Sequence, residues 1–104
     1  MKRHTAAWVR KAEDDLGGAQ DLAAGRPPRR DLVCFHCQQT AEKYLKALVQ
    51  ETGGVVPRTH DLVALLDLLL PHEPTLTGLR RGLASLTHYA VDYRYPSLRP
   101  VSAR

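Results

Sequence analysis

Residues 31–52 read DLVCFHCQQTAEKYLKALVQET, and this stretch decides the fold class. Its apolar residues recur every three or four positions, which is the period of an amphipathic α-helix. The stripe that they form contains Val33, Cys34, Cys37, Ala41, Tyr44, Leu45, Leu48 and Val49. Asp31 suits the N-cap or the first turn, and Gly53-Gly54 ends the helix. The stretch therefore predicts one long helix with a wide buried side.

Helical periodicity continues on both sides of this stretch. Residues 5–24 form one amphipathic segment. A short helix starts at the cap Thr59, and a last one runs from after Pro74 to Pro96. The apolar positions of this last helix are Leu76, Leu79, Leu83, Leu86, Ala90 and Tyr93. No sustained alternation indicates a strand, so the sequence predicts an all-α, antiparallel up-and-down bundle of about four helices.

The size and composition are those of one globular domain, with 104 residues, 43% apolar and 25% charged. We predict a single domain over residues 1–104, with a core at about 5–98 and a loose tail at 99–104. The sequence shows no leader and no apolar run of the roughly 20 residues that a membrane span needs, so we expect a cytoplasmic protein. The net charge of +4 permits contact with nucleic acid, but it also fits a solvated surface with a small excess of Arg.

Two cysteines, Cys34 and Cys37, form a C-x-x-C pair. Such a pair occurs in redox motifs and in zinc sites. No second pair is present to complete a zinc site, and no alternation of strands and helices suggests a redox fold. The spacing instead places both thiols on the apolar side of the helix, where we expect them to pack in the core. We therefore predict no metal site and no cofactor.

The last helix carries the residue pair best suited to catalysis. Arg81 and His88 are seven residues apart, which places them on one face of a helix, with Ser85 between them. An Arg can stabilise the charge that develops on a phosphate, and a His can exchange protons near neutral pH. The pair is therefore a candidate site for RNA cleavage by the ribose 2′-hydroxyl. The polar outer face of an ordinary amphipathic helix is the competing interpretation.

Two further groups are candidates for ligand binding. His36, Gln39 and Lys43 share one face of the long helix and can contact a phosphate or a base edge, or else form ordinary solvated pairs. Arg58 and His60 flank the start of the short helix, where backbone N–H groups favour an anion. The capping role of Thr59 explains part of this segment without a ligand.

Tyrosines gather near the end of the last helix. Tyr89, Arg94 and Tyr95 lie close together there, and exposed Tyr and Arg side chains favour interfaces and base stacking. Tyr93 belongs to the apolar stripe of the helix. We therefore include Tyr89, Arg94 and Tyr95 among the predicted ligand-binding residues.

Three motifs in this order resemble the HEPN family of helical domains. They are CFHCQQTAEKYLKA at residues 34–47, PRTHDL at 57–62 and YAVDYRYP at 89–96. The resemblance extends over about residues 5–98. It implies a helical bundle that forms a homodimer and is the partner of a minimal nucleotidyltransferase encoded beside it, in a toxin–antitoxin-like pair with nucleotide or RNA as ligand.

The same resemblance bears on catalysis. Many HEPN members are RNases that carry an Arg and a His, separated by a short spacer, on the last main helix at the dimer interface. The six residues between Arg81 and His88 match the upper limit of that spacer. Gly82 replaces a residue that is often polar in active members. A metal-independent endoribonuclease and a ligand-free interaction module therefore stand as alternatives.

Overall fold

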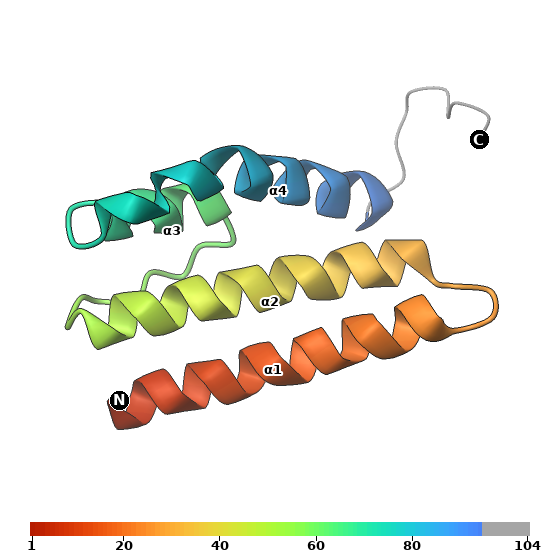
Figure 1. Cartoon of the computed structure of the whole chain (residues 1–104), viewed down its shortest axis with the longest axis horizontal. Helices are drawn as coiled ribbons and strands as arrows, with labels where there is room; N and C mark the ends of the chain where they lie inside the picture. The colour runs from red at the N-terminus through yellow and green to blue at the C-terminus, as the bar shows by residue number, and fades with distance from the viewer. Residues whose placement is uncertain (95–104) are drawn as a thin grey trace.

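The computed structural model describes the backbone of residues 1–94 and the side chains of residues 1–89 (Figure 1). Its elements are α1 (Arg3–Ala24), α2 (Arg30–Glu51), α3 (Leu62–Leu69), the 3-10 helix η1 (Pro74–Leu79) and α4 (Arg80–Arg94). No strand occurs in residues 1–94, and the all-α helical bundle is confirmed. None of the helices described is long and apolar enough to cross a bilayer.

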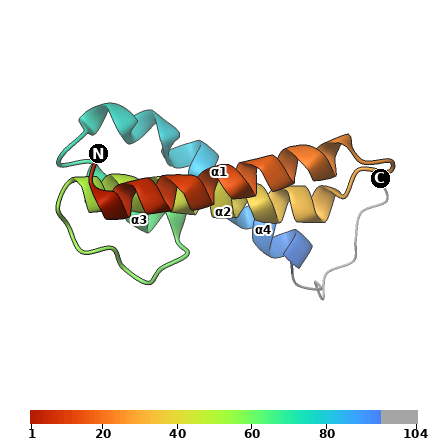
Figure 2. The same ribbon diagram turned by 90° about the horizontal axis from the view of Figure 1, so that it is seen from below.

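Helix α2 is the centre of the molecule. It packs antiparallel to α1 on one side and contacts α3 and α4 on the other (Figure 1). Among the helices of residues 1–94, α1 packs on α2 alone. Helix α4 crosses α2 obliquely (Figure 2). The short α3 runs in the same direction as α2, because the loop before it doubles back (Figure 1). The bundle is therefore open between α1 and α4.

The apolar core lies where α3 meets α2. The four leucines of α3 that face inward are fully or almost fully buried: Leu62, Leu65, Leu66 and Leu69. Leu45 and Val49 of α2 form one cluster with Leu62, Leu65 and Leu69, and Leu76, Leu83 and Leu86 pack against this cluster from η1 and α4. Each buried leucine contributes about 1.5–3 kcal/mol to stability. An eight-residue helix is unstable alone, so this packing holds α3 in place.

The cap of α3 differs from the prediction. Asp61, not Thr59, is the N-cap, and its Oδ1 accepts hydrogen bonds from the N–H groups of Val63 and Ala64 at 3.0 and 3.2 Å. Thr59 accepts from the Asp61 N–H with its hydroxyl at 3.1 Å. Asp61 takes this role because it directly precedes Leu62, the first core residue of the helix.

The predicted last helix consists of two elements. Residues from Pro74 to Leu79 form the tighter 3-10 helix η1, and α4 begins at Arg80. A 3-10 helix turns further per residue than an α-helix, so it breaks the heptad register. As a result Leu79 is exposed, whereas Leu83 packs on the core. The side chains of Ala90 and Tyr93 lie outside the described residues.

The buried side of α2 is partly polar, contrary to the prediction. Tyr44 and Leu48 are exposed, and both cysteines are only half-buried. Glu42 and Lys46 are buried instead. The cause is that α2 has neighbours on two sides. Positions at the edge of its wide apolar stripe face the open side of the bundle, and polar positions face the seam with α1 and the loop before α3.

Candidate functional site

The outer face of α4 carries the predicted catalytic pair. Arg81 and His88 are both exposed, on the side of the helix opposite Leu83 and Leu86. Seven residues correspond to about 10 Å along the helix axis. Neighbouring Arg80 pairs with Asp67 of α3, whereas Arg81 forms no ion pair with the residues described. The Arg81 guanidinium is therefore available to an anion on the same face as His88.

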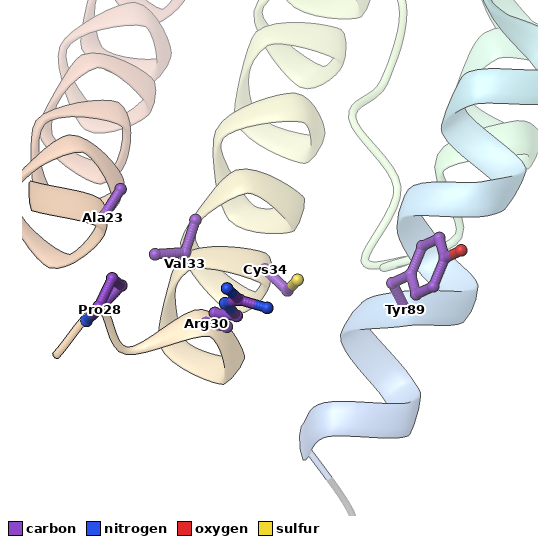
Figure 3. A pocket seen from close by; sticks show the side chains of 6 residues that line it. All are labelled: Ala23, Pro28, Arg30, Val33, Cys34 and Tyr89. Carbon is purple, nitrogen blue, oxygen red and sulfur yellow. The ribbon is translucent and has the colours of Figure 1, made fainter. Parts of the chain in front are cut away.

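Tyr89 lies next to this pair and is 52% exposed. Its ring meets that of His88 edge-on, with the ring centroids 6.0 Å apart. Tyr89 also lines an open pocket of about 450 Å³ between the start of α2 and α4, together with Ala23, Pro28, Arg30, Val33 and Cys34 (Figure 3). Two predicted ligand-binding residues fall outside the description: the Arg94 side chain and the whole of Tyr95.

The lining of this pocket is largely apolar. Cys34 points toward α4, and Val33 points toward α1 (Figure 3). Burial raises the pKa of the Cys34 thiol, and nearby Cys37 and Asp31 raise this pKa further. The thiol is therefore neutral at physiological pH and acts as part of the apolar wall.

An ionic cluster joins α1 to α2. Asp15 of α1 accepts from His36 Nδ1 at 3.0 Å and from the ammonium of Lys43. Burial opposes the ionisation of Asp15, but the hydrogen bonds from Lys43 and His36 outweigh it and hold the pKa of this carboxyl below its usual value. The imidazole lies beside Gly18, 3.7 Å from the position that a Cβ would take there, which is an ordinary van der Waals distance. His36 and Lys43 are thus occupied within the chain.

A second cluster, centred on the buried pair Glu42 and Lys46, lies next to the first along α2. Glu42 accepts from Lys46 Nζ at 3.0 Å and pairs with His60 Nδ1 at 2.9 Å. The Lys46 ammonium also lies 5.6 Å from the centre of the Trp8 ring. Gln38 donates to the His60 carbonyl at 3.1 Å. These contacts fasten the loop before α3 to α2.

The predicted anion site at the start of α3 is only partly available. Arg58 and His60 are exposed, and Arg58 forms no ion pair within the part of the chain described. However, Asp61 already accepts from two of the first N–H groups of α3. His60 is held by Glu42. The geometry therefore favours a structural role for this segment.

The predicted residues thus fall into separate groups. Arg81, His88 and Tyr89 lie together on α4, whereas His36 and Lys43 lie at the α1–α2 seam with half-buried Gln39 outside their ionic contacts. The sequence did not single out Asp15 or the pocket residue Arg30. For Arg30, the cluster of three arginines at positions 26, 29 and 30 was the available signal.

The family comparison concerns almost the entire chain. A model described as HEPN domain matches residues 5–103, which include every predicted site residue. No curated protein matches the chain, and no solved structure does.

Proposed function

The chain belongs to the HEPN domain family, and we propose that it binds nucleotide or RNA as the partner of a minimal nucleotidyltransferase in a toxin–antitoxin-like pair. The observation that carries this proposal is the exposed part of α4, where Arg81 and His88 share the outer face and Tyr89 is exposed at the edge of that face nearer α2. A guanidinium binds phosphate and an exposed aromatic ring stacks on a base, so this face suits a single-stranded nucleic acid. We also propose a cytoplasmic homodimer.

RNA binding is tested by fluorescence anisotropy with a labelled single-stranded oligonucleotide. We expect saturable binding that weakens with salt, because phosphate contacts release counterions. Arg81→Ala should weaken binding several-fold. Lys11→Ala, at an exposed position of α1, removes the same charge and should have little effect. Equal losses in the two variants would show that only net charge matters and would remove α4 from the proposal.

The proposed complex with a nucleotidyltransferase is tested by co-expressing this chain with a tagged nucleotidyltransferase encoded beside it. We expect the two proteins to co-purify at a fixed ratio. If the tagged protein elutes alone, the pairing is wrong. Co-purification without any binding of RNA or nucleotide would instead support the ligand-free interaction module.

A metal-independent endoribonuclease is the second candidate, favoured by the exposure of Arg81 and His88 on one face of α4. His88 would act as general acid or base on the 2′-hydroxyl or the leaving oxygen, and Arg81 would stabilise the phosphorane charge. We expect RNA cleavage in the presence of a chelator. Both His88→Ala and Arg81→Ala should abolish it, and His72→Ala, at another exposed histidine, should not. Cleavage that survives both α4 substitutions rules out this pair.

A further inference from the structure

The pocket between the start of α2 and α4 has the size of a small-ligand site. Its volume of about 450 Å³ lies within the range of pockets that hold small molecules and cofactors. Three helices and a loop contribute to it: Ala23 is in the last turn of α1, Pro28 is in the loop, Arg30 begins α2 and Tyr89 lies on α4 (Figure 3). Within the part of the chain that the structure describes, α1 and α4 both contribute to the pocket without contacting each other.

An aromatic ring and apolar side chains form the walls. The ring of Tyr89 is half exposed, although burying such a ring is favourable. Val33, Pro28 and the neutral thiol of Cys34 add apolar surface. A flat aromatic group is the ligand that such a surface favours, because stacking on Tyr89 would cover both rings.

The charge in the pocket is a single guanidinium. Arg30 is exposed and forms no ion pair with any residue that the structure describes, and the same holds for Arg26 and Arg29 in the adjoining loop. Two acids in the same part of the sequence, Asp21 and Asp31, offset part of the charge of these arginines. Of these charged residues, Arg30 is the one that lines the pocket. A ligand with one anionic group beside its aromatic ring would match this arrangement.

We propose that this pocket binds one nucleotide unit, with the base against Tyr89 and the phosphate at Arg30. This assignment rests on the proposed binding of nucleotide or RNA, and it places the ligand where the end of α1, the start of α2 and α4 come together. A free mononucleotide and the terminal nucleotide of an RNA share this chemistry. A volume of about 450 Å³ is large enough for one such unit.

The test is isothermal titration of the full chain with adenosine 5′-monophosphate, adenosine and inorganic phosphate. We expect saturable binding of the monophosphate, weaker binding of adenosine and none of phosphate alone. Two oligoadenylates, with a 5′-phosphate and with a 5′-hydroxyl, distinguish the sources. Tighter binding of the phosphorylated oligonucleotide than of the monophosphate identifies an RNA end as the ligand, and the reverse order identifies the free nucleotide.

Substitutions locate the site. Tyr89→Ala should weaken binding of the monophosphate about tenfold or more, and Tyr89→Phe should retain it, because stacking needs only the ring. Ala23→Leu should block the pocket at an exposed helical position where leucine is well tolerated. Arg30→Gln should reduce the monophosphate to the affinity of adenosine. Arg29→Gln is the matched control and should change nothing.

Two results would overturn the assignment. One is the absence of saturable binding by the monophosphate and both oligonucleotides. The other is binding that Tyr89→Ala and Ala23→Leu leave unchanged while circular dichroism shows both variants folded. If RNA binding then still depends on Arg81, the pocket is excluded and the proposed function stands. If no nucleic acid binds at all, both fail.

Discussion

Asp15 of α1 forms ionic contacts with two residues of α2. Its side chain is only 13% exposed, and it accepts from His36 and Lys43, both on α2. Hydrogen bonds to charged groups contribute more than neutral ones, and burial limits their screening by solvent. Because α1 packs on no other helix in residues 1–94, this contact bears directly on how firmly α1 is held.

We predict that Asp15→Asn destabilises the protein by about 1–3 kcal/mol at pH 7, measured by urea unfolding. The folded pKa of Asp15 lies below its ordinary value of 3.8, so its contribution is complete above that pH and is lost as the pH falls through the folded pKa. The gap between wild type and variant should therefore close in strong acid. Asp14→Asn, at an exposed neighbour, is the control. A gap independent of pH would contradict the ionic role.

Glu42 and Lys46 form the most buried charged pair described, with side chains 5% and 7% exposed. Removing one partner leaves the other charge buried without compensation. We predict that Glu42→Gln costs about 3 kcal/mol or more, and that adding Lys46→Met recovers part of this loss. The measurement is a double-mutant cycle from urea unfolding, with Glu13→Gln as an exposed control. Simple additivity of the two changes would show that the pair is not coupled.

At this scale, sequence alone predicts part of the site. Helical spacing correctly relates Glu42 to Lys46 and Arg81 to His88. Helical spacing does not reveal that Glu42 and Lys46 are buried. The residues that contact them, Trp8 and His60, come from distant segments of the sequence. The same holds for Asp15: its pairing with His36 joins residues 21 positions apart. Such contacts depend on how helices are placed side by side, which periodicity does not encode.

At the scale of the elements, two glycines have opposite roles in the long helices. Gly17 lies within α1, and a Cβ there would meet no atom within 4 Å. Gly53 follows α2 with a φ of 86°, which disfavours residues with a Cβ. Glycine therefore weakens α1 at the first position and is required to end α2 at the second.

We predict that Gly17→Ala stabilises the protein by about 0.5–1 kcal/mol, because alanine is the better helix former and the unfolded chain loses freedom. Gly53→Ala should instead destabilise it by about 1 kcal/mol. Urea midpoints for both variants provide the measurement, and each serves as the control for the other. A change of the same sign in both would mean that backbone conformation does not decide the effect.

The helices themselves are well predicted from sequence, and their ends less so. The first two were expected at residues 5–24 and 31–52, and α1 and α2 span Arg3–Ala24 and Arg30–Glu51. Long periodic stripes and glycine stops give strong local signals. The cap at Asp61 and the 3-10 helix η1 depend instead on how α3 and α4 meet the core, so local signals placed them incorrectly.

At the scale of the whole molecule, the bundle is open along one face of α2. Arg30, Cys37, Tyr44 and Leu48 recur along this face, and the last two are exposed although large and apolar. The pocket occupies the end near Arg30, and Leu48 lies about 27 Å further along the helix. Tyr44 and Leu48 are one helical turn apart, and adjoining exposed apolar side chains of this kind suit a protein contact.

We predict a homodimer that uses this face at the end near Tyr44 and Leu48. Light scattering at micromolar concentration should give about twice the chain mass of 11.6 kDa. Leu48→Glu should produce a monomer, because it places a charge within the buried contact. Leu68→Glu introduces the same charge at an exposed leucine of α3 and should leave the dimer intact.

The two variants separate the location of the contact from its existence. A monomeric wild-type protein would refute the dimer itself. A dimer that Leu48→Glu leaves intact would place the contact elsewhere, and α4 with Arg81 and His88 is then the next face to test. Since the pocket lies at the opposite end of α2, a dimer formed near Leu48 leaves it open, and nucleotide binding should be equal in the monomeric variant and the wild type.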